Sequence, residues 1–156
     1  MKNESRLCII IPARSGSKGI PNKNIREING KSLLLRTFES ATKICNIQNI
    51  CLSTDSQVYY DHVAKKYTPI FLKRDSRISG DDALAIEVWK DAINYLNKNH
   101  CNYEYSLLLE PTSPFRNIDW IKINIEKFIK SQDDLWMSVK ETDSKFRIEK
   151  QFDLKN

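Results

Sequence analysis

The sequence predicts an α/β fold with a mostly parallel central sheet covered by helices. Short apolar runs of strand length alternate with segments whose apolar residues recur every three or four positions, and the connections between them are short. Helical crossovers of this kind join parallel strands. At 156 residues the chain can form one domain with its own core, so we expect a single domain over residues 1–156.

The first half of the chain alternates strand and helix. An apolar run predicts a strand at Leu7–Pro12, and a second strand follows at residues 49–53. Between them, residues 32–44 are expected to be helical, because their apolar side chains recur at helical spacing (Leu34, Leu35, Phe38, Ala41 and Ile44). A second helix is expected from Asp55 or Ser56 to about residue 66.

The second half continues the same alternation. A short strand at 69–72 leads through a long polar loop into a helix at 83–98. That helix is expected to bury Ile86, Val88, Trp89, Ile93 and Leu96. An uninterrupted apolar run at 105–109 is typical of a strand inside a sheet. Asn117 is a plausible N-cap for a helix at 118–130. A fifth strand is expected at residues 135–139.

Composition excludes several classes of protein. Hydrophobic residues make up 40% and charged residues 29% of the chain, as in soluble globular proteins, and no apolar run approaches the roughly 20 residues that span a bilayer. The N-terminus lacks the features of a secretory signal, so we expect a cytoplasmic chain with no membrane partner. The four cysteines form no C-x-x-C pair, which favours buried thiols over disulfides or zinc.

Positive charge is concentrated near the N-terminus. The net charge is +5, and residues 1–36 hold eight Lys or Arg and two Glu. A regular basic helix face would suggest nucleic acid, but none is present. The excess instead surrounds one loop, which favours a pocket for a compact polyanion over a nucleic-acid surface.

That loop follows the first predicted strand and reads IPARSGSKGIPNKN over residues 11–24. It contains two glycines and the cations Arg14, Lys18 and Lys23, with no acid. Glycines allow backbone N–H groups to turn toward an anion, and the cations neutralise its charge. The loop therefore predicts a polyphosphate site, with a plain surface turn as the alternative.

Polar side chains follow three further predicted strands. Asp55 follows the second strand, Arg74 begins the polar loop after the third, and Glu110 begins the loop that extends to Arg116 after the fourth. Ligands of open α/β sheets bind beyond the carboxyl ends of the strands. We therefore expect these loops to converge on one site.

Two phosphate-binding signatures are absent. Gly30-Lys31-Ser32 imitates the end of a P-loop, but Ile25 stands where that motif requires glycine, and Asn29-Gly30 indicates a turn into the helix. The first loop also lacks the G-x-G-x-x-G pattern of dinucleotide-binding folds.

The motifs together resemble those of a known enzyme family. Residues 11–24, LSTDS at 52–56 and LEPTSPFR at 109–116 are similar to three ordered signatures of the acylneuraminate cytidylyltransferases, the CMP-sialic acid synthetases. The resemblance extends over residues 7 to about 139, and legionaminate and other nonulosonate enzymes look similar. It implies a three-layer, Rossmann-like nucleotide-diphospho-sugar transferase fold.

The resemblance also implies a reaction. CTP and a sialic-acid-like 2-keto sugar would give the CMP-sugar and pyrophosphate with the help of a divalent metal, usually Mg²⁺. The anomeric hydroxyl of the sugar would attack the α-phosphate in line, and positioning and charge neutralisation would do most of the work. Family members are homodimers.

Site residues follow from the same resemblance. Arg14, Lys18 and Lys23 are the expected catalytic cations, and Asn24 would contact the base or ribose. Asp55 could assist a hydrated metal or orient a lysine, or it could cap the following helix. The nucleotide side would comprise Ala13, Arg14, Ser15, Gly16, Ser17, Lys18, Gly19, Lys23, Asn24 and Arg74, and the sugar side Glu110, Thr112, Ser113 and Arg116.

Several roles stay open at the sequence level. Arg74 could be a solvated surface charge, and Arg116 could pair with Asp119 instead of a sugar carboxylate. Asp81 and Asp82 are expected to be a loop or helix cap. Glu110 stands where sialic acid synthetases usually have glutamine, which leaves the identity of the sugar open.

The chain differs from the family pattern at its end. Family members continue into a dimer-forming segment and a late aspartate motif that binds the catalytic metal, whereas this sequence ends at Asn156, and Asp143 and Asp153 match no such motif. The alternatives are therefore a nucleotide-binding remnant with little turnover, or a cytidylyltransferase for another keto sugar such as Kdo.

Overall fold

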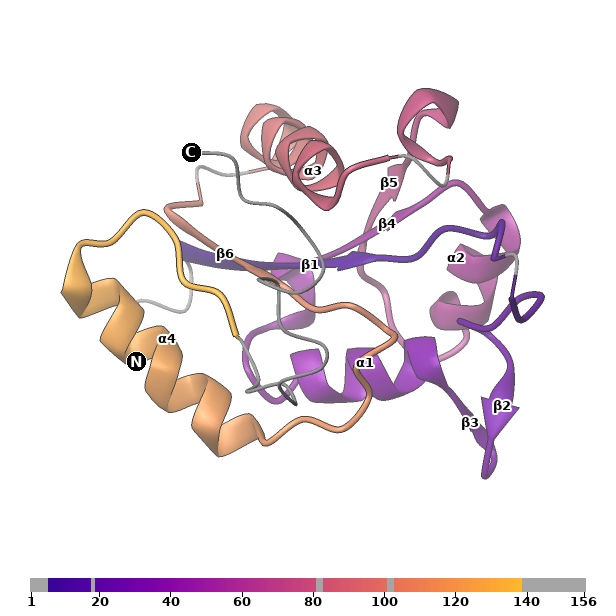
Figure 1. Ribbon diagram of the computed structural model, residues 1–156, viewed down its shortest axis with the longest axis horizontal. Helices are drawn as coiled ribbons and strands as arrows, with labels where there is room; N and C mark the ends of the chain where they lie inside the picture. Colours follow the sequence, from indigo (N-terminus) through magenta and orange to yellow (C-terminus); the bar gives the residue numbers. More distant parts are fainter. Residues whose placement is uncertain (1–5, 18, 81–82, 101–102, 139–156) are drawn as a thin grey trace, which may run out of the picture.

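The central sheet has four parallel strands in the order β5-β4-β1-β6 (Figure 1). The computed structural model describes residues 6–17, 19–80, 83–100 and 103–138. All four strands lie where the sequence predicts them to within one or two residues: β1 (Leu7–Pro12), β4 (Ile50–Thr54), β5 (Ile70–Lys73) and β6 (Tyr105–Leu108).

Strand β1 lies between two neighbours. Ile9 is in register with Ile50 of β4 on one side and with Leu107 of β6 on the other. Residues 7–11 of β1 are all buried, because helices cover both faces of the sheet at this strand. This explains why β1 is apolar throughout and does not alternate with polar residues.

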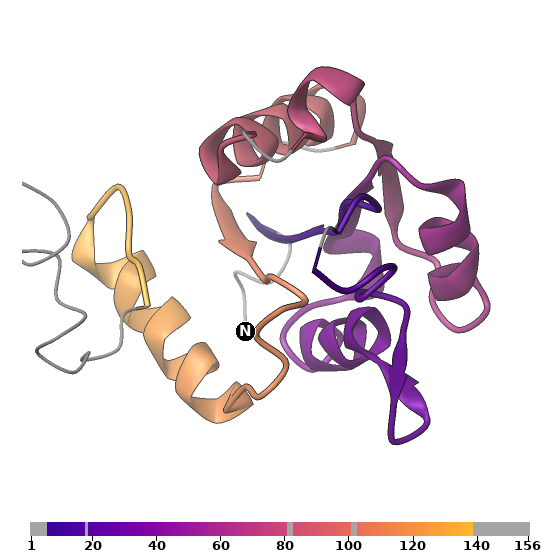
Figure 2. The same ribbon diagram turned by 45° about the vertical axis from the view of Figure 1, so that its right-hand side comes forward.

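Helices cover both faces of the sheet and form three layers, as predicted (Figures 1 and 2). Helix α3 (Ala85–Asn99) lies on one face, and α1 (Leu33–Ala41), α2 (Gln57–Ala64) and α4 (Ile118–Ser131) lie on the other. Alternate β1 residues divide between two cores: Ile9 and Ile11 pack with α1, whereas Cys8 and Ile10 pack with α3. The chain also forms two short 3₁₀ helices, η2 (Ile47–Asn49) and η3 (Ser76–Ile78).

Side-chain caps fix where three helices begin. The hydroxyls of Ser32 and Ser56 accept hydrogen bonds from backbone N–H groups in the first turns of α1 and α2. Asn117 caps α4 in the same way, as predicted, by accepting from Trp120 N–H at 2.9 Å. Because Ser56 caps α2, the capping role considered for Asp55 is wrong.

Two details of the sequence-based prediction are wrong. Residues 135–138 do not form the expected fifth strand. After α4, Gln132 adopts a left-handed conformation, and the Trp136 indole donates to Asp133 at 2.6 Å and contacts the Phe128 ring, so this segment turns back toward α4. Val139 lies outside the described residues. The second wrong detail is Ile86, which was expected to be buried but lies on the exposed side of α3 with 44% of its surface accessible.

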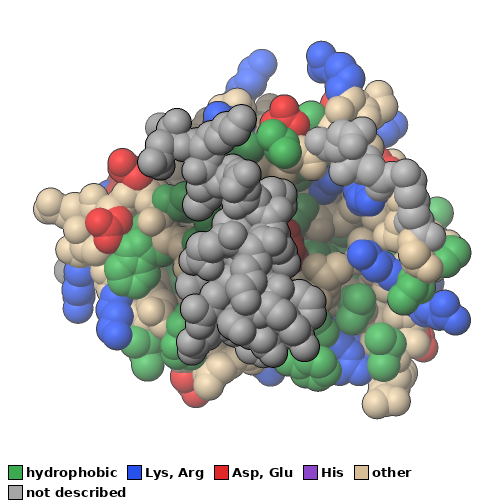
Figure 3. All heavy atoms as spheres, in the orientation of Figure 1, with side chains coloured by type: hydrophobic (Ala, Val, Ile, Leu, Met, Phe, Trp, Pro, Cys, Tyr) green, Lys and Arg blue, Asp and Glu red, His purple; other side chains and the backbone are tan. Residues whose placement is uncertain are grey.

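Helix α4 is less deeply packed than the other helices. It contains no fully buried residue, although Ile121 and Ile125 contact the core. Trp120 and Ile123 are each about half exposed. Figure 3 shows hydrophobic side chains at the surface over this helix. The helix therefore contributes less to the core than α1 does.

A two-stranded hairpin precedes α1. Strands β2 (Glu27–Ile28) and β3 (Lys31–Ser32) pair antiparallel through the Asn29-Gly30 turn, which has positive φ at both positions, 52° and 70°. The turn is in the predicted place, but the strand pairing is an addition to the prediction. Arg36 donates to the carbonyls of Ile28 and Lys31, and the hairpin projects from the body of the protein (Figure 2).

No helix in the described ranges is long and apolar enough to cross a membrane. Cys8, Cys45 and Cys51 are buried, as predicted, while Cys101 lies outside these ranges. Burial, aided by the nearby Cys8, raises the pKa of the Cys51 thiol to about 12. The thiol therefore stays protonated and unreactive in the folded chain.

The His62 side chain makes the stability of this region pH-dependent. His62 Nε2 and Ser32 Oγ are 2.8 Å apart, so α2 contacts the N-cap of α1. Burial, with a smaller effect of Lys65, lowers the pKa of His62 below its ordinary 6.5. As the pH falls, the unfolded chain therefore takes up the proton first, and stability decreases. The contribution of His62 is full above pH 6.5 and is lost as the pH falls through the lower folded-state pKa.

We therefore expect the free energy of unfolding, measured in urea between pH 7.5 and 5, to fall more steeply in the parent chain than in His62→Gln. The exposed His100→Gln serves as the matched control and should keep the parent slope. Equal slopes in the parent and His62→Gln would contradict the prediction.

Candidate functional site

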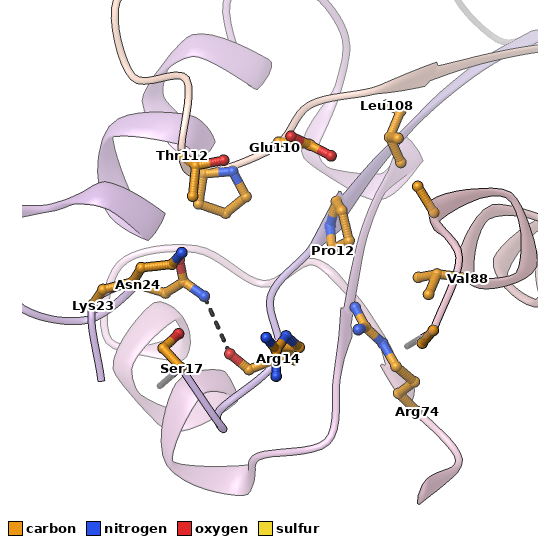
Figure 4. Close-up of a pocket in the computed structure, with 13 residues that line it drawn as sticks. Pro12, Arg14, Ser17, Lys23, Asn24, Arg74, Val88, Leu108, Glu110 and Thr112 are labelled. Carbon is orange, nitrogen blue, oxygen red and sulfur yellow. Dashed lines mark hydrogen bonds between the residues drawn. The ribbon is translucent and has the colours of Figure 1, made fainter. Parts of the chain in front are cut away.

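A cavity of about 200 Å³ lies beyond the carboxyl ends of the central strands (Figure 4). Four segments line it, and three of them are strand-end loops that the sequence predicts to converge. The lining residues are Pro12, Arg14, Ser17, Lys23 and Asn24 at and after the end of β1, Arg74 after β5, Ala83, Ala85 and Val88 at the start of α3, and Leu108, Glu110, Pro111 and Thr112 at and after the end of β6.

Positive charge dominates the cavity. Arg14, Lys23 and Arg74 contribute three cations, and among the described residues that line the cavity Glu110 is the only acid. Glu110 and Thr112 lie across the cavity from Arg14 and Ser17 (Figure 4). One wall is therefore suited to an anion, and the opposite wall offers groups that accept hydrogen bonds.

Arg74 is held by the end of β4. Its Nη2 donates to the Ser53 carbonyl at 2.8 Å, its Nε donates to Ser53 Oγ at 3.2 Å, and its backbone N–H donates to the Thr54 carbonyl at 2.9 Å. The residue is only 6% exposed, so it is not the solvated surface charge that the sequence left open.

Burial lowers the pKa of the Arg74 guanidinium, and repulsion from Arg14 lowers it further, while Asp55 and Asp91 act in the opposite direction. Arginine nevertheless keeps its charge in proteins. Two like charges thus share one side of the cavity, and an anion placed between them would relieve their repulsion.

The loop after β1 is fixed by hydrogen bonds on both sides of Arg14. Ala13 N–H donates to the Ser53 carbonyl at 2.9 Å. Ser15 donates to Asp55 through its N–H at 2.8 Å and through its hydroxyl at 2.7 Å. Arg14 Nη1 also donates to the Gly16 carbonyl at 2.9 Å. These contacts hold the first part of the loop against the end of β4.

Asn24 combines burial with an unsatisfied acceptor. The side chain is 4% exposed and donates through Nδ2 to the Arg14 carbonyl at 3.2 Å. Its Oδ1 has no hydrogen-bond partner within the described part of the chain. A buried acceptor without a partner is costly, and a donor on a bound ligand would remove that cost.

The two loop glycines are not required by the chain's own packing. A Cβ added at Gly16 would contact only the Arg14 side chain at 3.7 Å, and one added at Gly19 would meet nothing within 4 Å. Neither residue has a positive φ. Lys18, between them, lies outside the described residues, so its predicted role stays a prediction.

On the predicted sugar side, the structure separates two pairs of residues. Glu110 and Thr112 line the cavity, whereas Ser113 and Arg116 do not. Arg116 donates to the Glu110 carbonyl and, at 3.3 Å, to the Thr37 hydroxyl of α1. Burial lowers the pKa of Arg116. These partners, which differ from both partners suggested by the sequence, hold the loop after β6 against α1.

The described residues offer no ready-made metal centre. No three Asp, Glu, His or Cys side chains within the described ranges come together as ligands. Both oxygens of Asp55 accept from Ser15, and Asp55 does not line the cavity. Its assignment as a metal ligand stays a prediction. Asp81, Asp82, Asp143 and Asp153 lie outside the described residues.

Sequence reasoning missed two kinds of site residue. Ser53, which binds both Arg74 and the loop after β1, lies in the LSTDS motif, but the motif alone did not indicate this role. Val88 was expected only as a buried helix position, but it also lines the cavity. Its position at the start of a helix that follows a functional loop is the one signal that could have indicated this.

Comparison with known proteins identifies the family of the chain. A family model described as "Cytidylyltransferase" matches residues 8–156. The chain belongs to the cytidylyltransferase family. This confirms the resemblance of the three motifs, and the match includes every residue of the cavity.

The curated relatives of the chain include enzymes named for several acidic sugars. N-acylneuraminate cytidylyltransferase of Escherichia coli O18:K1:H7 is 38% identical over 113 residues, 72% of this chain and 26% of the relative. Pseudaminic acid cytidylyltransferase of Campylobacter jejuni is 36% identical over 132 residues, 85% of this chain and 55% of the relative. CMP-N,N'-diacetyllegionaminic acid synthase of Legionella pneumophila is 31% identical over 121 residues, 78% of this chain and 52% of the relative.

Solved structures confirm the predicted fold class. One match is CMP:2-keto-3-deoxy-manno-octonic acid synthetase, solved in complex with CTP. The TM-score is 0.63 at 18% sequence identity, and the match covers 81% of this chain and 48% of the synthetase chain. A cytidylyltransferase from Leptospira borgpetersenii gives a TM-score of 0.64 at 18% sequence identity. This match covers 81% of this chain and 50% of the Leptospira chain. The chain thus spans between 26% and 55% of the length of the relatives named here.

Proposed function

We propose that this chain binds CTP and transfers its CMP group to a sialic-acid-like nonulosonate, releasing pyrophosphate. One observation carries the proposal: Arg14, Lys23 and Arg74 line one cavity at the carboxyl ends of parallel strands. Family membership supports the reaction type, and the names of the relatives support an acidic keto sugar as the acceptor.

The proposed residue roles follow from charge and hydrogen bonding. Arg14, Lys23 and Arg74 would neutralise the triphosphate while the sugar hydroxyl attacks the α-phosphate. One P–O bond forms to the sugar and one breaks to release pyrophosphate, so negative charge grows on the leaving group. Cations held in place before the reaction stabilise that charge without reorganising. Lys18 would be a further cation, as the motif predicts.

Asn24 is the proposed contact to the ribose or the base. Its buried Oδ1 has no partner within the described residues, whereas a ribose hydroxyl or a cytosine amino group can donate to it. The same side chain contacts the Arg14 carbonyl, so nucleoside binding would couple directly to the phosphate loop.

Mg²⁺ is proposed as the companion of CTP. In nucleotide sites Mg²⁺ is held by one or two carboxylates together with phosphate oxygens and water, and it lowers the charge of the triphosphate. Within the described residues no three Asp, Glu, His or Cys side chains come together, so phosphate oxygens of CTP and water would supply most of the metal's ligands. The buried thiols of Cys8, Cys45 and Cys51 support a cytoplasmic location, where thiols stay reduced.

The decisive experiment uses the 156-residue chain. Calorimetry with CTP and Mg²⁺ should show saturable binding. Pyrophosphate release should then depend on an acceptor, tested with N-acetylneuraminate, pseudaminic acid, diacetyllegionaminic acid and Kdo in parallel. CTP binding without release would identify a nucleotide-binding unit with little turnover, and the absence of CTP binding would refute the proposal.

Glu110 is expected to influence which acceptor is used. Its side chain lines the cavity, where a carboxylate accepts hydrogen bonds from sugar hydroxyls but repels a sugar carboxylate. We expect Glu110→Gln to increase pyrophosphate release with N-acetylneuraminate by about fivefold, because removing such repulsion in a solvated site is worth on the order of 1 kcal/mol.

Glu126→Gln, an exposed position on α4 outside the cavity, is the matched control for this prediction. It should leave the rate of pyrophosphate release unchanged. No gain in rate with Glu110→Gln would contradict a role of Glu110 in acceptor choice.

A further inference from the structure

Asp55 does not line the cavity, yet both of its carboxylate oxygens bind the loop that carries Arg14. Oδ1 accepts from the Ser15 N–H at 2.8 Å, and Oδ2 accepts from the Ser15 hydroxyl at 2.7 Å. We propose that Asp55 is a positioning residue that acts through Ser15 to fix this loop, so that Arg14 is directed toward the triphosphate. The identity of the anion rests on the proposed function.

Two anchors at the end of β4 lie on either side of Arg14. Ala13, on one side, donates to the Ser53 carbonyl at 2.9 Å, and Ser15, on the other, donates to Asp55. The Ser53 carbonyl also accepts from Arg74 at 2.8 Å. The end of β4 therefore sets the positions of both arginines. Without Asp55, the backbone around Arg14 would keep one of its two anchors to the end of β4.

The chemistry of Asp55 suits this role. Hydrogen bonds to a charged carboxylate are shorter and stronger than neutral ones, and Asp55 makes two of them to one residue. Ser56, not Asp55, caps helix α2. Coulombic attraction to Asp55 also acts to raise the pKa of Arg74, which favours the charged form of that guanidinium. A support of this kind keeps a binding side chain in its productive orientation.

Substitutions at both partners separate positioning from direct contact. Asp55→Ala removes both hydrogen bonds, and Ser15→Ala removes the one from the hydroxyl. Asp55→Asn loses the charge but keeps an oxygen for the Ser15 N–H and an amide donor for the Ser15 hydroxyl. Asp61, an exposed acid on α2, provides the matched controls Asp61→Ala and Asp61→Asn.

In the full 156-residue chain, we expect Asp55→Ala to weaken CTP binding about tenfold and Ser15→Ala to weaken it a few-fold, as for loss of charge-assisted hydrogen bonds. Asp55→Asn should stay close to the parent affinity. The double variant Ser15→Ala/Asp55→Ala should bind no more weakly than Asp55→Ala, because both substitutions remove the same link. The Asp61 controls should match the parent.

Hydrogen exchange of the Ser15 amide provides a second readout that needs no ligand. Exchange should become faster in Asp55→Ala and remain slow in Asp55→Asn. Unchanged exchange in Asp55→Ala would overturn the positioning role. The positioning role would also be overturned if Asp55→Asn bound CTP as weakly as Asp55→Ala while Ser15→Ala kept the parent affinity. In that case the charge of Asp55, and not its link to Ser15, would support CTP binding. A parent chain that fails to bind CTP overturns the proposed function, while the exchange data still decide the anchoring.

Discussion

Replacing Arg14 with alanine is expected to weaken CTP binding by about ten- to a hundredfold, or about 1.4–3 kcal/mol. Arg14 lines the cavity beside Arg74, and its backbone is anchored on both sides to the end of β4. An ordered guanidinium of this kind makes charge-assisted hydrogen bonds to phosphate oxygens at little further entropic cost. Calorimetry with CTP measures the effect, and Lys23→Ala should act in the same direction.

The matched control for Arg14→Ala is Arg26→Ala, because Arg26 is an exposed arginine near the same loop that does not line the cavity. This control should retain CTP affinity close to that of the parent. Unchanged affinity in both Arg14→Ala and Lys23→Ala would contradict the assignment of this loop to the triphosphate.

The largest expected effect on stability is that of Phe38→Ala. Phe38 is fully buried in α1, packs in the core against the sheet, and stacks on Tyr67 with ring centroids 5.5 Å apart. Removing a buried aromatic ring loses its transfer free energy and leaves a cavity, which costs about 3–5 kcal/mol. Urea unfolding followed by circular dichroism measures the change in the free energy of unfolding.

Phe115→Ala provides the comparison for this prediction, because Phe115 is 98% exposed. The free energy of unfolding should change little in that variant. A loss below about 1 kcal/mol in Phe38→Ala would mean that the core around α1 is not packed as described, since such a value is typical of surface substitutions.

The sequence predicted the elements of the sheet well, because strand-length apolar runs and helical spacing are local signals. The prediction failed where tertiary contacts decided the structure. Residues 135–138 have the composition of a strand, but they follow a left-handed turn at Gln132 and contact α4 instead. The β2–β3 pairing escaped prediction because two-residue strands leave almost no pattern, although the Asn29-Gly30 turn was visible.

For the candidate site, three of the four strand-end loops expected from the sequence line the cavity, whereas the one with Asp55 does not. How the side chains pair was not predicted. Arg14, Lys23, Asn24 and Arg74 were expected together and do line one cavity. The link between Ser15 and Asp55 joins residues 40 positions apart, and no local pattern encodes it. Likewise, Arg116 could be predicted to have a partner, but its bond to Thr37 depends on how α1 packs.

The order of the strands has a consequence for biosynthesis. β1 is made first, yet both of its neighbours come later, and the second of them begins only at Tyr105. Until the ribosome has produced that segment, the nascent chain carries an apolar strand with an open edge, which is the kind of surface that aggregates with other chains. One edge of β1 is therefore expected to stay unpaired during synthesis until residues 105–108 have been added.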